Sequence, residues 1–199
     1  MNWVERSHRE SLSITRRRLA AHREGSFVAL YPRTDDALQM VVPGGIPQED
    51  LHLTLASFEH APIGGQSADA MTRAMNELAD SFTVIVAEVM GHATFNPGGP
   101  ITPDEGGPYG RDEPCTVYIV TDSEQLSDLR DEVLEAARTQ LNLPPQHTPW
   151  VPHVTAAVHM DARLLSFTGQ VLFDRMGLTW QGRTQYFPLL GSTISAYSD

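Results

Sequence analysis

The chain has 199 residues, of which 41% are apolar, and a formal net charge of −11. This length and apolar content fit one domain with a real hydrophobic core. The longest apolar runs are far shorter than the roughly 20 residues of a membrane-spanning helix, and the N-terminus lacks the apolar segment of a secretory signal. We therefore expect a cytoplasmic, monomeric protein with no membrane partner.

The charge is divided unevenly along the chain. Residues 1–24 hold six Arg and three Glu, a net charge of +3, so residues 25–199 must carry −14. Nonspecific affinity for nucleic acids comes mainly from neutralised phosphates, so a body this acidic disfavours long nucleic acid as a partner. The first 24 residues contain no Pro or Gly, which predicts a basic helical arm ahead of a single domain at 25–199.

In the first half of that domain, turn residues separate short apolar runs from one amphipathic segment. We predict strands at 26–32 and 51–58, helical turns at 35–42, a turn-rich connector at 43–50, a helix at 67–80 and a strand pair or one long bent strand at 82–95. Ser67 or Asp69 is the expected helix cap. The strand region is expected to break near Gly91.

The second half opens with a Gly/Pro-rich connector at 96–114, where regular structure cannot form. Strands follow at 115–121 and 150–158, a helix capped by Ser123 at 123–141, and two or three final strands at 171–192 with a turn at Gln181-Gly182. Helices and strands segregate without strict alternation. The sequence therefore predicts an α+β domain of two related, pseudo-symmetric lobes.

Each half contains one His-x-Thr triplet inside an apolar run: "LHLTL" at 51–55 and "PHVTA" at 152–156. A strand places residues i and i+2 on the same face, so His52 projects with Thr54 and His153 with Thr155. If the two strands converge, one imidazole can accept a proton while the other donates one, and the hydroxyls can hold phosphate oxygens. The four residues predict a phosphodiester-cleaving site.

These motifs resemble those of the two-histidine (2H) phosphoesterases, which carry a pair of H-x-[ST]-apolar sequences. "FVALYP" is similar to the family's first strand, "DLHLTLASF" to its first motif and "WVPHVTAAV" to its second. The family includes bacterial RNA 2′,3′-cyclic phosphodiesterases, long called 2′-5′ RNA ligases, and phage enzymes that degrade the cyclic oligonucleotides of host immune signalling. The resemblance implies antiparallel sheets lining a central cleft, helices outside and no metal or cofactor.

The resemblance also implies that His52 and His153 are the catalytic pair, with Thr54 and Thr155 beside them. Two aromatic residues near the motifs, Tyr31 and Trp150, are candidates for stacking on a nucleobase, although buried aromatic residues are common in any domain. Zinc is not expected, because the remaining histidines show neither the helical H-x-x-x-H spacing nor a cysteine pair.

The expected function is a metal-independent phosphodiesterase acting on a small nucleotide or short oligonucleotide with a 2′,3′-cyclic phosphate, a 2′-5′ linkage or a cyclic linkage. Cyclic oligonucleotides of immune signalling are among the expected substrates. One alternative is a protein that binds a nucleotide in the same cleft without turnover. Another is an RNA 2′-5′ ligase, which would run the reverse reaction at the same site.

Overall fold

The computed structural model describes residues 26–58, 65–98, 114–141, 143–180 and 182–192. The predicted arm at 1–24 and most of the connector at 96–114 lie outside these ranges. The described helices are α2 (Thr34–Met40), α3 (Gly65–Ala79) and α4 (Glu124–Gln140), and the described strands are β1 (Phe27–Pro32), β2 (Leu53–Ser57), β3 (Ile85–Phe95), β4 (Cys115–Val120), β5 (His153–Val158), β6 (Gly169–Trp180) and β7 (Arg183–Pro188).

Most predicted elements are confirmed, and two details of the prediction are wrong. Helix α3 begins at Gly65, so Ser67 and Asp69 lie within its first turns and neither is a cap. Strand β3 continues through Gly91. Its pairing with β4 shifts register between Val89 and Gly91. The strand is therefore the long bent one, because an irregular pairing bends a strand without ending it.

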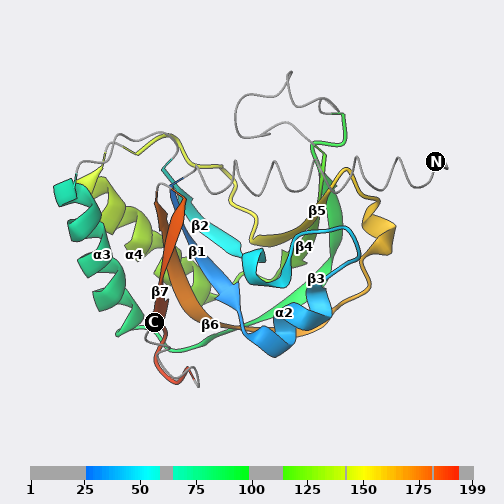
Figure 1. Cartoon of the computed structure of the whole chain (residues 1–199), viewed down its shortest axis with the longest axis horizontal. Helices are drawn as coiled ribbons and strands as arrows, with labels where there is room; N and C mark the ends of the chain where they lie inside the picture. The colour runs from blue at the N-terminus through cyan, green and yellow to red at the C-terminus, as the bar shows by residue number, and fades with distance from the viewer. Residues whose placement is uncertain (1–25, 59–64, 99–113, 142, 181, 193–199) are drawn as a thin grey trace.

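The strands form one antiparallel sheet in the order β1-β2-β5-β4-β3-β6-β7 (Figure 1). Strand β6 also pairs with β1, from Phe27↔Thr179 to Pro32↔Phe173. Strand β6 therefore closes the sheet on itself, because it pairs with β1 as well as with β3 and β7. The order is also symmetric about the boundary between β2 and β5, with β1 outside β2 as β4 lies outside β5. This arrangement places the two predicted motif strands side by side.

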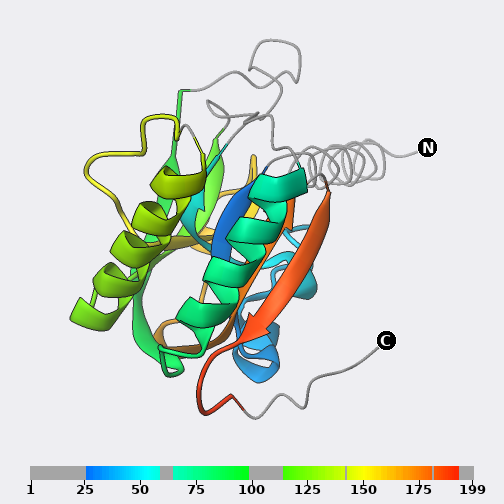
Figure 2. The same cartoon turned by 90° about the vertical axis from the view of Figure 1, so that its left-hand side faces the viewer.

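Helices α3 and α4 run beside each other and pack on the outer face of the sheet (Figure 2). Helix α4 buries Leu126, Leu129, Val133 and Ala137, a spacing of three and four residues that turns one apolar stripe towards the core. Its N-cap is Ser123, whose hydroxyl accepts a hydrogen bond from the Leu126 N–H at 3.2 Å, as predicted.

Helix α3 contributes Met71, Met75 and Ala79 to the same core. The helices thus cover one face of the strands and leave the other face to carry polar side chains. The predicted α+β class, with helices outside antiparallel strands, is confirmed. Among the described helices, none combines the length and apolar character needed to span a membrane.

Candidate active site

The second His-x-Thr motif begins β5, and in the first motif His52 lies immediately before β2. The two strands meet at the antiparallel pair Leu53↔Val154. Leu53 and Val154 are each 0% exposed and belong to the core beneath the helices. Since neighbouring residues of a strand point to opposite faces, the flanking His and Thr side chains project to the other face. The apolar–polar alternation of each motif therefore places all four polar side chains on one face of the sheet.

Continuing the antiparallel register by one residue in each direction places His52 opposite Thr155 and Thr54 opposite His153. The Leu53–Val154 pair thus marks a local two-fold axis between the motifs. His52 and His153 thus each precede one member of the pair at which β2 and β5 meet. The two imidazoles and the two threonine hydroxyls therefore lie on the same face of the sheet, around the strand junction.

Both imidazoles are oriented by the same backbone interaction. The Nδ1 atom of His52 lies 2.7 Å from the Asp50 carbonyl oxygen, and that of His153 lies 2.7 Å from the Val151 carbonyl oxygen. A carbonyl oxygen can only accept, so each Nδ1 carries the proton and donates it. In the neutral tautomer, Nε2 of each ring then holds the lone pair and is the nitrogen able to accept a proton.

The motif strands share a single backbone pair, and the side chain of a glutamine adds a second hydrogen-bonded connection between their segments. Gln146 precedes β5, and its Nε2 donates to the Ser57 carbonyl oxygen at 2.9 Å. Its Oε1 accepts from the Ser57 N–H at 3.1 Å. The amide thus pairs with β2 as a neighbouring strand would, and it holds the segment before His153 against the strand that follows His52.

His52 lies between two aromatic rings of β1. Its ring stacks on Phe27 at a centroid distance of 5.0 Å with 16° between the planes. The Tyr31 ring is tilted beside it at 5.7 Å. Phe27 and Tyr31 share a strand face with Ala29, whose small side chain leaves space between them. Sequence reasoning missed Phe27, although its period-two relation to Tyr31 on the predicted strand was a usable signal.

The predicted Tyr31 is thus brought to the site, where its ring contacts His52. The side chain is 4% exposed, and burial raises the pKa of the phenol to about 12 in spite of hydrogen bonding to Thr179 and Thr184. Tyr31 is therefore a neutral phenol at physiological pH. Its stacking on a nucleobase stays a prediction.

His153 has different neighbours. The Phe95 ring meets it edge to face at 4.8 Å and 65°, and Ile119 of β4 is its cross-strand partner. Burial lowers the pKa of the imidazole, against an opposing contribution from the hydrogen bond to Val151, and the nearby His147 lowers it further. Phe95 was missed in the sequence because its contact with His153 depends on the pairing of β3 with β4 and of β4 with β5.

Trp150 lies elsewhere. Its half-buried ring packs against the core, and the Arg130 guanidinium lies 4.6 Å from the ring centroid. These contacts give Trp150 a structural environment on the helix side of the sheet, whereas the His and Thr side chains project to the other side. The predicted stacking of Trp150 on a nucleobase stays a prediction.

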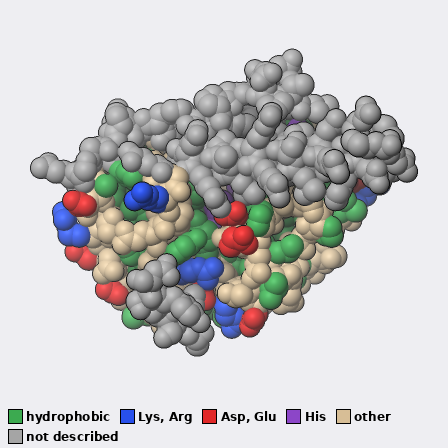
Figure 3. Space-filling view, viewed as in Figure 1, with side chains coloured by type: hydrophobic (Ala, Val, Ile, Leu, Met, Phe, Trp, Pro, Cys, Tyr) green, Lys and Arg blue, Asp and Glu red, His purple; other side chains and the backbone are tan. Residues whose placement is uncertain are grey.

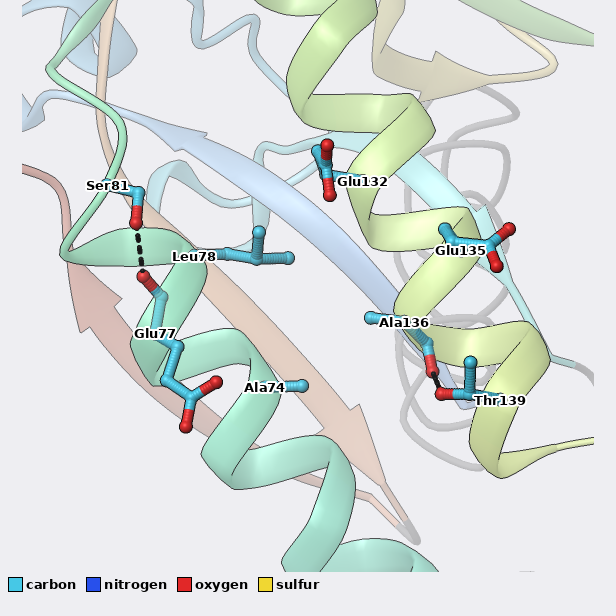
Figure 4. Close-up of a pocket in the computed structure, with 8 residues that line it drawn as sticks. All are labelled: Ala74, Glu77, Leu78, Ser81, Glu132, Glu135, Ala136 and Thr139. Atoms are coloured by element: carbon cyan, nitrogen blue, oxygen red, sulfur yellow. Dashed lines mark hydrogen bonds between the residues drawn. The ribbon is translucent and has the colours of Figure 1, made fainter.

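Charged side chains are interspersed on the described part of the face in Figure 3, where they form no broad positive surface. A hollow between α3 and α4 is lined by three carboxylates, Glu77, Glu132 and Glu135 (Figure 4). Its other lining residues supply no cation, so the hollow does not favour a phosphate. Within the described ranges, no group of three or more His, Cys, Asp and Glu residues is placed to hold a metal ion.

Comparisons with known proteins bear on the fold. No known family model and no curated protein matches the sequence. Among solved structures, TT0787 of Thermus thermophilus matches with a TM-score of 0.55 at 18% identity, over 83% of this chain and 94% of that one. E. coli LigT in complex with 3′-AMP matches with a TM-score of 0.54 at 16% identity, over 83% and 95%. The chain has the LigT fold.

A further structure described as a phosphoesterase matches equally well, with a TM-score of 0.54 at 16% identity over 83% of this chain and 95% of that one. The fold that the motifs' resemblance implies is thus confirmed. At these identities the likeness concerns the backbone. Any activity must therefore be inferred from the side chains of this chain.

Proposed function

We propose that the protein is a metal-independent phosphodiesterase that acts on a small nucleotide or short oligonucleotide, with His52 and His153 as its acid–base pair. The observation that carries the proposal is the symmetric orientation of the two imidazoles. Both donate from Nδ1 to a carbonyl oxygen two residues earlier, at 2.7 Å in each case. Both Nε2 atoms are therefore suited to proton transfer at one phosphate.

The reaction follows from this arrangement. One neutral imidazole accepts a proton from the attacking water, whose oxygen forms a new bond to phosphorus. The other, protonated imidazole donates a proton to the ester oxygen as its bond to phosphorus breaks. Hydrolysis of a 2′,3′-cyclic phosphate then yields a phosphate monoester and a free hydroxyl. Thr54 and Thr155 donate hydrogen bonds to the non-bridging oxygens, where negative charge accumulates.

The surroundings favour His153 as the base. Burial lowers the pKa of its imidazole, so a larger fraction is neutral and able to accept a proton near pH 7. His52 is then the acid. Its stacking on Phe27 at 5.0 Å suits this role, because the face of an aromatic ring attracts a cation.

Charge limits the size of the substrate. Residues 25–199 carry a net charge of −14, and acidic and basic side chains alternate on the described part of the face in Figure 3. A long polyanion gains little from such a surface. A cyclic phosphate, a 2′-5′-linked dinucleotide or a cyclic oligonucleotide needs only the local site. The same argument disfavours the RNA ligase, which must hold two RNA ends.

The test is one incubation of the purified protein with a mixed panel of linear RNA, 2′,3′-cyclic ends, 2′-5′-linked dinucleotides and cyclic oligonucleotides, read by mass spectrometry with and without EDTA. We expect cleavage of one or more small substrates at an unchanged rate in EDTA. Loss of activity on chelation, with recovery on adding metal, would identify a metalloenzyme instead. Binding without turnover of any panel member would favour the nucleotide-binding protein.

A further inference from the structure

An arginine lies in the same cross-strand row as His52. Arg175 of β6 is the register partner of Tyr31 on β1, and the Tyr31 ring lies 5.7 Å from the His52 ring. His52, just before β2, Tyr31 on β1 and Arg175 on β6 thus follow one another across the sheet. Since adjacent strands are about 4.8 Å apart, the backbone of β6 at Arg175 lies roughly 10 Å from that of β2 at His52.

The Arg175 guanidinium is held between two tyrosines. Its Cζ atom is 5.8 Å from the Tyr31 ring centroid and 5.6 Å from that of Tyr186 on β7. The two rings meet edge to face at 5.0 Å. Gly177 makes room for this cluster, because a Cβ atom there would lie 2.6 Å from Cε2 of Tyr31. The packing holds the guanidinium beside Tyr31, whose ring in turn contacts His52.

Asp174 holds the guanidinium by one nitrogen. Nη1 of Arg175 donates to Oδ1 of Asp174 at 3.0 Å, and the Asp174 side chain is 3% exposed whereas that of Arg175 is 20% exposed. A guanidinium has five N–H donors in a planar fork that matches phosphate oxygens. The ion pair therefore anchors the side chain at one corner and leaves donors for a second anion.

The position of Arg175 differs from that of the other arginine on a described strand. Thr179 and Thr184 are register partners whose hydroxyl oxygens lie 2.9 Å apart, and both bond to Tyr31 on the site face. Arg183 is adjacent to Thr184 and pairs with Trp180, so it projects to the opposite face. Arg183 is therefore a matched control of the same charge on the neighbouring strand.

We propose that Arg175 binds the phosphate of a nucleotide linked to the scissile phosphodiester, so that the preferred substrates contain two or more nucleotides. This inference rests on the proposed function, because it takes the scissile phosphate to lie between His52 and His153. A phosphate held there is too far away to engage a guanidinium two strands distant. The next phosphate along a linked nucleotide reaches it over the Tyr31 ring.

The experiment measures binding, which does not depend on turnover. The ligands are adenosine 3′-monophosphate, with one phosphate, and the dinucleotide ApAp, with an internal and a 3′-terminal phosphate. Replacing Arg175 alone would leave the Asp174 carboxylate buried without its partner, which destabilises the fold. We therefore compare Asp174→Asn with the double variants D174N/R175M and D174N/R183M, after thermal unfolding shows that all three are folded.

We expect the Kd of ApAp to rise about 10- to 100-fold in D174N/R175M, as for loss of a charged hydrogen bond, while the Kd of the mononucleotide changes less than about twofold. D174N/R183M should bind both ligands as D174N does. An equal loss for both ligands, an unchanged Kd for ApAp, or no binding of ApAp to D174N would overturn the inference.

The proposed function is tested separately, by measuring cleavage when the wild-type protein is incubated with ApA that ends in a 2′,3′-cyclic phosphate. Absence of cleavage together with Arg175-dependent binding of ApAp would contradict the enzyme and support the phosphate site. Cleavage without Arg175-dependent binding would do the opposite.

Discussion

The half that carries His52 and the half that carries His153 share a backbone plan but not a side-chain environment. Each histidine precedes a core residue at the strand junction and donates from Nδ1 to a carbonyl oxygen two residues earlier. His52 is stacked on Phe27 with 16° between the planes. His153 meets Phe95 edge to face at 65°. The backbone thus orients the two imidazoles in the same way, whereas the aromatic side chains around them give the two rings different environments.

In the proposed function, that difference assigns different roles to the two histidines. A shared phosphate needs one neutral and one protonated imidazole at the same pH, which two identical environments would not favour. Burial lowers the pKa of His153 and so favours its neutral form. His52 has instead a flat contact with the face of the Phe27 ring, which His153 lacks. Three sets of substitutions and one titration can break or sharpen this comparison.

The largest effect is expected from removing either imidazole. His52→Ala and His153→Ala should each lower kcat about 10²- to 10⁴-fold, because each removes one proton-transfer group, while KM changes little. Steady-state kinetics on the best panel substrate measures this. His159→Asn is the control, since His159 has a positive φ of 54° that Asn tolerates. Full activity in either alanine variant would remove that histidine from the mechanism.

A smaller effect is expected at the threonines, where the two halves can be compared directly. Thr54→Val and Thr155→Val keep the side-chain shape and remove the hydroxyl, so each should lower kcat/KM about 10- to 100-fold through one lost hydrogen bond to a charged oxygen. The ratio of the two losses measures how symmetrically the phosphate is held. If neither variant loses activity, the hydroxyls do not contact the phosphate.

The smallest effect is expected at Gly177, which supports only the His52 half. A Cβ atom in Gly177→Ala would lie 2.6 Å from Cε2 of Tyr31, so the Tyr31 ring, which contacts His52, must shift. We expect the free energy of unfolding to fall by about 1–3 kcal/mol, with a loss of kcat/KM below that of the threonine variants. Gly91→Ala is the control, because nothing lies within 4 Å of its added Cβ. Equal effects of the two changes would contradict this role for Tyr31.

The sequence predicts those features of the site that depend on periodicity within one strand. The alternation at 51–58 places Leu53 in the core and His52 and Thr54 on the other face, as observed. The Ser123 cap is predicted for a similarly local reason, since its hydroxyl meets an N–H three residues later. The Ser67 cap is wrong, because α3 begins at Gly65 and no polar pattern ahead of Ser67 indicates the earlier start.

Features that depend on pairing between distant strands could not be predicted in the same way. The register Leu53↔Val154 joins residues 101 positions apart, and Gln146 meets Ser57 across 89 positions. Arg175 reaches the His52 row only because β6 pairs with β1. Its sequence neighbours give no sign of this contact, since Asp-Arg within a strand is equally compatible with a solvated ion pair.

The central claim, that His153 is the base and His52 the acid at one phosphate, is tested most directly by the pH dependence of kcat/KM in the wild type and both alanine variants. Burial sets the pKa of His153 below its ordinary value of about 6.5, so wild-type activity should fall as the pH drops below that range, and should fall again at high pH as the proton-donating group of the pair is lost. His153→Ala should lose the acidic limb of this bell and His52→Ala the basic limb. An intact bell in either variant, or the opposite pairing of limb and residue, would contradict the account.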